Sequence, residues 1–136
     1  MDALTQTLKE KIEAADRAIT AENFDELMEF YADTASLVVK PGLTVAGKDS
    51  IRRAFVAIAD YFNHSMVVTQ GEMLVIPGGD VALVIMETLL QATDKSGAKT
   101  DITRRATYVF QQISGQWLCV VDNSYGTTLL DALIES

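Results

Sequence analysis

Apolar residues recur with two different periods along this chain of 136 residues, and the change of period separates a helical front from an extended back. Apolar side chains three or four positions apart lie on one face of an α-helix. The first such series is Leu4, Leu8, Ile12, Ala15 and Ile19. A capping-box pattern, Asn23 followed by Glu26, predicts a short second helix over residues 24–31, and Gly47 precedes a third helical series over residues 51–62. The front of the chain is therefore expected to form three helices.

The extended segments are separated by turns. Residues 35–40 and 43–46 are β-branched and flank Pro41-Gly42, which predicts a small hairpin. Three later turns, at residues 77–80, 95–99 and 114–115, divide the rest into strands over residues 64–76, 81–93, 100–113 and 116–125. Helices first and strands last indicate an α+β domain, with the helices on one face of a curved, mainly antiparallel sheet. We expect residues 1–136 to form this one domain.

Pairing the strands through their turns sorts the side chains onto two faces, because the side-chain period of a strand is two. One face collects polar residues: Glu87, Arg105, Thr107, Asp122 and Ser124. The other collects large apolar residues, of which the main ones are Met86, Tyr108, Phe110, Trp117 and Cys119. Both faces also hold aliphatic residues, whereas the helices can cover only one of them. We expect the polar face to meet the helices, and the face with Met86, Tyr108, Phe110 and Trp117 to form the interface of a homodimer.

The polar face supplies the candidate chemistry. A carboxylate held in an apolar pocket has a raised pKa and can transfer protons near neutral pH, which makes Glu87 and Asp122 the candidate catalytic residues. Arg105 beside them would instead hold a carboxylate ionised, and a structural ion pair is the alternative interpretation. The single histidine, His64, and the single cysteine, Cys119, are interpreted as structural side chains.

Composition narrows the classes of partner. The net charge of −8 disfavours nucleic acid and anionic membranes, which select Lys- and Arg-rich faces. One histidine and one cysteine give little support for a metal site, and no cofactor is expected. The amino-terminal residues lack the apolar core of a signal peptide, and a lone cysteine excludes an internal disulfide. These features predict a cytoplasmic protein.

Three stretches resemble the NTF2-like superfamily, and within it the SnoaL-like and ketosteroid-isomerase-like branch that includes domains of unknown function. They are ENFDELMEFYADTASLV, GKDSIRRAF and the W-x-x-x-x-D-N-S-Y-G end of the last strand. The resemblance implies a cone-shaped, cystatin-like fold, in which a strongly bent mixed sheet of six strands wraps around three helices and leaves a pocket at the open end. It also implies dimers formed through the outer face of the sheet. The residues expected around the pocket are Asp16, Tyr31, Phe55, Glu87, Arg105, Thr107 and Asp122.

The catalytic groups of ketosteroid isomerase do not carry over to this sequence. Its helix-one tyrosine corresponds to Ala15, its base aspartate to Lys40 or Val39, and its oxyanion-binding aspartate to about Thr107. The function expected first is therefore binding of a small, largely apolar organic ligand. One alternative is a metal-independent isomerase, cyclase or dehydratase that uses Glu87 or Asp122 as base. The other is a dimerisation module without ligand, which a pocket filled by phenylalanines, Phe30, Phe55 and Phe62, would favour.

Overall fold

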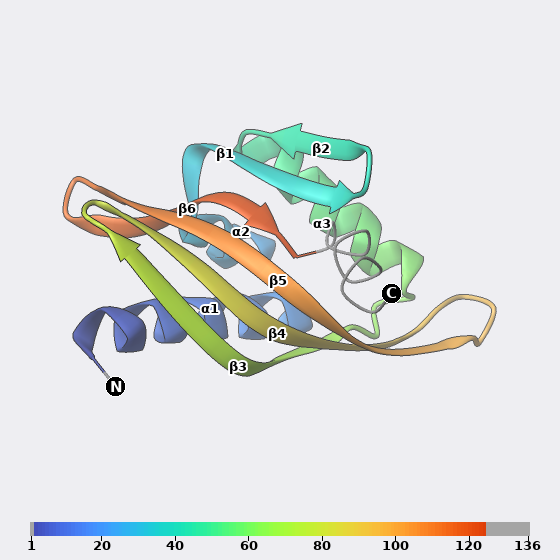
Figure 1. The fold of residues 1–136 in the computed structure, drawn as a ribbon. Helices are drawn as coiled ribbons and strands as arrows, with labels where there is room; N and C mark the ends of the chain where they lie inside the picture. Colours follow the sequence, from blue (N-terminus) through green and yellow to red (C-terminus); the bar gives the residue numbers. More distant parts are fainter. Residues whose placement is uncertain (1, 125–136) are drawn as a thin grey trace.

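The computed structural model describes residues 2–124, which form helices and a long, bent sheet (Figure 1). The helices are α1 (Ala3–Ala21), α2 (Phe24–Leu27), the 3-10 turn η1 (Met28–Phe30) and α3 (Lys48–Tyr61). The strands are β1 (Tyr31–Lys40), β2 (Leu43–Ala46), β3 (Val67–Gly78), β4 (Val81–Thr93), β5 (Lys99–Ile113) and β6 (Gln116–Asn123). The expected α+β class and all six strands are confirmed. Tyr31, expected in the second helix, instead begins β1, and Tyr125, expected at the end of the last strand, lies outside the described residues.

Local signals account for the helix ends. The Asp2 carboxylate accepts a hydrogen bond from the Thr5 backbone amide (2.7 Å) and so caps the start of α1. The predicted capping box forms at α2: Asn23 Oδ1 accepts from the Glu26 amide (3.3 Å), and Asn23 Nδ2 donates to Glu26 Oε2 (2.8 Å). Gly47 is the N-cap of α3 and has a φ of 88°, a conformation that glycine adopts without strain.

The six strands form one mixed sheet in the order β2-β1-β6-β5-β4-β3. Only the β1–β6 pair is parallel among the pairs within residues 2–124. Irregularities interrupt the pairing in β1, in β3 between Gln70 and Met73, and in β6. Such bulges bend strands, and the bent sheet curves around α1 and the α2–η1 segment, while α3 packs against β1 and β2 (Figure 1).

The face of the sheet that meets the helices is the opposite of the one expected. Met86 and Phe110 are 2% and 0% exposed, and Tyr108 is also buried, so they belong to the core of one chain and not to a dimer interface. The Phe30 ring packs edge-on against Tyr108 and Phe110, at centroid distances of 6.0 and 5.5 Å. Trp117 is partly buried against the same core. The bulkier apolar face packs on the helices because it removes more apolar area from water.

A bulge in β6 changes the register near its end. Phe110 pairs with Cys119 and Val109 pairs with Val121, so Val120 has no partner of its own. Beyond this extra residue, Asp122 pairs with Tyr108, not with Thr107 as expected. Asp122 is therefore turned toward the helices together with Tyr108, and it is 3% exposed.

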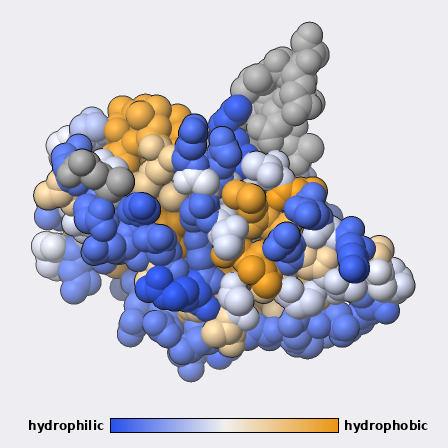
Figure 2. Space-filling model, turned by 90° about the horizontal axis from the view of Figure 1, so that it is seen from below, coloured by the Kyte–Doolittle hydropathy of each residue, from blue (hydrophilic) through white to orange (hydrophobic). Residues whose placement is uncertain are grey.

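The surface away from the core is mixed in character. Seen from the side of α1 and β3, it is mainly hydrophilic, with separate hydrophobic patches (Figure 2). Among residues 2–124, no helix combines the length and the apolar character that a bilayer crossing requires.

Candidate functional site

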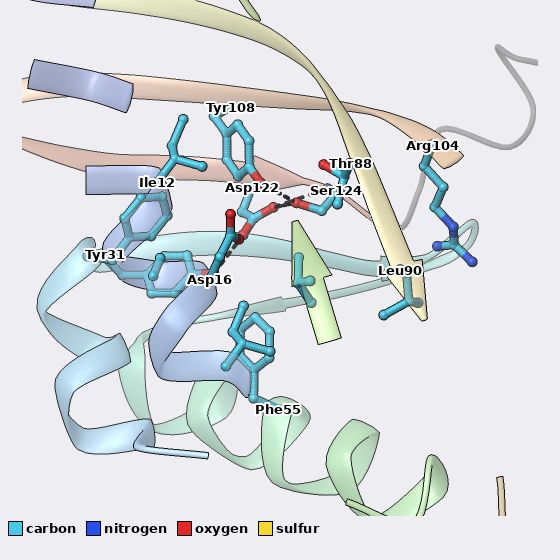
Figure 3. Close-up of a pocket in the computed structure, with 14 residues that line it drawn as sticks. Ile12, Asp16, Tyr31, Phe55, Thr88, Leu90, Arg104, Tyr108, Asp122 and Ser124 are labelled. Carbon is cyan, nitrogen blue, oxygen red and sulfur yellow. Dashed lines mark hydrogen bonds between the residues drawn. The ribbon is translucent and has the colours of Figure 1, made fainter. Parts of the chain in front are cut away.

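An internal cavity lies between α1, the start of β1, α3 and the inner face of β3 to β6 (Figure 3). Its free volume is about 30 Å³. This is room for one or two water molecules, since a water needs at least about 10–15 Å³. The exposed area of the wall is mostly apolar, although half of the lining residues carry a polar group: Asp16, Tyr31, Thr88, Arg104, Tyr108, Asp122 and Ser124. Such a wall, mainly apolar in area with convergent polar groups, is typical of small-molecule sites.

Asp122 is the most heavily hydrogen-bonded side chain of the cavity. The Tyr31 hydroxyl donates to its Oδ2 (2.6 Å), and the Ser124 amide (3.1 Å) and hydroxyl donate to its Oδ1. Ser124 Oγ also lies 3.1 Å from the Tyr108 hydroxyl. Because a serine hydroxyl has one hydrogen, Tyr108 donates in this second contact. Burial raises the pKa of Asp122, and its hydrogen bonds to Ser124 and Tyr31 oppose that rise.

Asp16 approaches the cavity from α1, on the buried face of the helix (Figure 3). The pKa of Asp16 is raised from 3.8 to about 7. Burial is the main cause, and the charge of the nearby Asp122 adds to the rise. The side-chain amide of Gln70 and the Arg17 guanidinium act in the opposite direction. Gln70 Nε2 is itself buried and makes no hydrogen bond of good geometry within residues 2–124. Asp16 therefore exchanges between its neutral and charged forms around neutral pH.

The two tyrosines stay protonated and act as donors. Both are buried, and burial is the main reason that the pKa of each hydroxyl rises well above 10.0; the Asp122 charge adds to the rise. Tyr31 is held by edge-on packing against Phe30 (5.0 Å between centroids). The strands place both tyrosines at the cavity: Tyr31 is the first residue of β1, and Tyr108 on β5 pairs with Asp122 on β6.

Four of the residues expected around a pocket line this cavity: Asp16, Tyr31, Phe55 and Asp122. The other three do not. Glu87 and Arg105 are exposed on the outer face of the sheet, where they are cross-strand partners, and Thr107 lies on that same face. Opposite charges across two strands stabilise a sheet, so the structural alternative describes Glu87 better than the catalytic one. The expected placement of these three residues was wrong because it came from the reversed sheet face.

Sequence reasoning missed Tyr108, Ser124, Thr88 and Arg104 as cavity residues. Tyr108 was assigned to the outer face, and Ser124 was placed on the polar face without a role in the pocket. His64 lies in a turn with φ of 58°, and its Nδ1 is 2.8 Å from Glu22 Oε1, so it is structurally bonded as expected. Cys119 is buried, and burial raises the pKa of its thiol. Within residues 2–124, no three His, Cys, Asp or Glu side chains lie close enough to hold a metal ion.

Comparisons with known proteins give one family from the sequence and one fold from the solved structures. The family model of the SnoaL-like domain matches residues 8–121. Curated protein sequences give no match. Among solved structures, a protein of unknown function with a cystatin-like fold from Nostoc punctiforme has a TM-score of 0.77 at 14% identity, with 92% of each chain covered.

Two further structures carry more specific descriptions. A candidate dehydratase of the NTF2-like family from Streptomyces avermitilis has a TM-score of 0.72 at 18% identity, covering 89% of this chain and 94% of that one. The association domain of CaMKII from C. elegans has a TM-score of 0.70 at 20% identity, covering 90% of this chain and 95% of that one. At these identities the similarity establishes the cystatin-like, NTF2-like fold.

Proposed function

This chain belongs to the SnoaL-like domain family, and from that premise we propose that its internal cavity is an acid–base site for a small, largely apolar organic molecule. The observation that carries the proposal is Asp16, a buried carboxyl group with a pKa of about 7 beside an apolar cavity. A general base or acid works best when its pKa lies near the working pH. Asp16 has that property.

Asp122 has the supporting role. Its carboxylate is fixed by Tyr31 and Ser124, so it has little freedom to follow a reacting proton. Its charge raises the pKa of Asp16, because two carboxylates close together resist ionising at the same time. Asp122 is therefore a positioning residue, and Asp16 is the group that transfers the proton. This assignment moves the catalytic role from the two candidates expected first, Glu87 and Asp122, to Asp16.

The ligand that fits these groups has an apolar body and a carbonyl or hydroxyl group. Removal of a proton beside a carbonyl is a step that isomerases, cyclases and dehydratases share, and the similarity to a candidate dehydratase is in keeping with it. A cavity of about 30 Å³ is too small for such a molecule, since ligand pockets are roughly 300–1,000 Å³. Binding therefore requires wall side chains such as Phe30, Phe55 and Leu90 to move.

Deuterium uptake tests this function. The protein is incubated in heavy water with small cyclic ketones, such as 1-indanone and 2-tetralone, and deuterium beside the carbonyl is measured by mass spectrometry. We expect the protein to accelerate uptake, with a rate that rises with pH through about 7 as Asp16 ionises. Asp16→Asn should lower the enzymatic rate by roughly 10²–10⁴-fold. Equal rates for wild type and Asp16→Asn, or no acceleration with any ketone, would remove the acid–base assignment.

A second candidate function is self-association, and two observations favour it. The narrow cavity, partly filled by Phe30 and Phe55, fits the expectation for a dimerisation module. The outer face of the sheet also carries exposed aliphatic side chains, namely Leu74, Ile76, Val81, Ile113 and Val121. The similarity to an association domain supports this proposal. This outer surface replaces the dimer interface expected at Met86, Tyr108, Phe110 and Trp117. The cytoplasmic location stays a prediction.

A further inference from the structure

A second hollow adjoins the cavity and differs from it in charge. It is an open groove of about 830 Å³ beside α3, bordered by β1, β2 and the ends of β4 and β5. Leu90 and Arg104 line both the groove and the internal cavity. Figure 3 shows these two residues on the side of the cavity away from Asp122. The groove therefore leads toward the cavity through Leu90 and Arg104.

The charged residues that line this groove within residues 2–124 are all basic. Lys40, Arg53 and Arg104 line it, and no Asp or Glu is found among its described lining residues. In a chain of net charge −8, Lys40 and Arg53 give the described wall of this groove a local positive charge. The ion pairs among residues 2–124 do not include Lys40 or Arg53. Arg53 Nη2 donates instead to Ser50 Oγ (3.1 Å).

The floor of the groove is apolar. Tyr61 is 64% exposed, and Leu43 and the partly buried Phe62 and Ile58 lie beside it. An apolar surface bordered by cations complements a molecule that has an apolar body and a negative end. Guanidinium groups such as that of Arg53 bind carboxylates with two parallel hydrogen bonds.

We propose that this groove binds an organic carboxylate with an apolar body, with its acid group at Arg53 and Lys40 and its apolar body extending past Leu90 toward the cavity. The inference deepens the proposed function, because it gives the class of ligand whose far end would reach Asp16.

Decanoate serves as the probe, with decan-1-ol and decylamine as uncharged and cationic controls of equal length, and binding is measured by isothermal titration calorimetry. We expect decanoate to bind more tightly than both controls. Arg53→Gln and Lys40→Gln should each weaken decanoate binding by about fivefold or more, and should leave decan-1-ol unchanged. Arg52→Gln is the matched control, because Arg52 precedes Arg53 on α3 but pairs with Asp25 (3.1 Å) and does not line the groove.

Three results would overturn the proposal: equal affinity for decanoate and decan-1-ol, an equal loss in Arg52→Gln and Arg53→Gln, or no decanoate binding by the wild type. The Asp16→Asn variant separates this proposal from the acid–base function. If Arg53→Gln weakens decanoate binding but Asp16→Asn leaves ketone deuteration unchanged, the groove proposal is supported and the acid–base function is contradicted. If deuteration depends on Asp16 and decanoate binding does not depend on Arg53, the reverse holds.

Discussion

Asp16 shows how one buried residue links stability to function. Its pKa is about 7 in the folded chain against 3.8 for an ordinary aspartate, so the folded state holds its proton more tightly. The stability from this protonation is present in full below pH 3.8 and is lost as pH rises through about 7. Asp16→Asn, which stays neutral, should therefore be stabilised relative to wild type by up to about 4 kcal/mol at pH 8 and by little at pH 4. Urea unfolding at both pH values measures this, and a difference independent of pH would contradict the assignment.

Tyr31 is expected to stabilise the fold through its hydrogen bond to the buried Asp122. The Tyr31 hydroxyl donates to Asp122 at 2.6 Å, and Tyr31→Phe removes this donor while keeping the ring. A buried acceptor left without its partner costs about 1–3 kcal/mol, so we expect that loss in the free energy of unfolding. Tyr61→Phe is the control, because Tyr61 is 64% exposed and should change stability by less than about 0.5 kcal/mol. Equal effects of the two changes would show that the hydrogen bond to Asp122 is not made.

At the scale of the element, β4 tests which face of the sheet meets the helices. Met86 and Glu87 are neighbours on opposite faces, the first 2% exposed and the second exposed. Met86→Ala should cost about 2–5 kcal/mol of stability through the lost packing, whereas Glu87→Gln should cost about 1 kcal/mol or less. Chemical denaturation compares them. A larger loss for Glu87→Gln would restore the face assignment that the alternation first suggested.

The elements themselves could be predicted from local signals. The periods of three to four and of two, the capping box at Asn23 and the turns at glycine gave all the helices and strands to within a few residues. The face of the sheet that meets the helices could not be predicted, because Leu83, Ile85 and Val109 make the outer face apolar as well. Alternation states which residues share a face, and only the packing of the helices decides which face is covered.

Only part of the site was predicted, because the wrong face of the sheet was expected to meet the helices. Asp16, Tyr31 and Phe55 come from the helical side and from the start of β1, so the reversed sheet face did not affect them. Asp122 was placed toward the helices by two errors that cancel: the reversed face, and the β6 bulge at Val120, which no glycine or proline marks. Glu87, Arg105 and Thr107 had no bulge to compensate and lie outside.

At the scale of the whole molecule, the outer sheet face predicts assembly. Leu74 and Ile76 on β3 are 56% and 46% exposed, which is unusual for aliphatic side chains that gather on one face of a sheet. We expect a dimer, and Leu74→Lys should shift it toward monomer by placing a charge in the interface. Sedimentation velocity at micromolar concentration measures the shift, with Val56→Lys on α3 as the control. A monomeric wild type would leave the outer face without an assembly role.

The central claim is that Asp16 is a buried acid–base group tuned by its neighbour Asp122. It is tested most directly by following the side-chain carboxyl carbon of Asp16 by ¹³C NMR as pH is varied. We predict a midpoint near 7 in the wild type, and a lower midpoint in Asp122→Asn, because the neighbouring charge that raises it is gone. A wild-type midpoint near 4, the value of an exposed aspartate, would contradict the account.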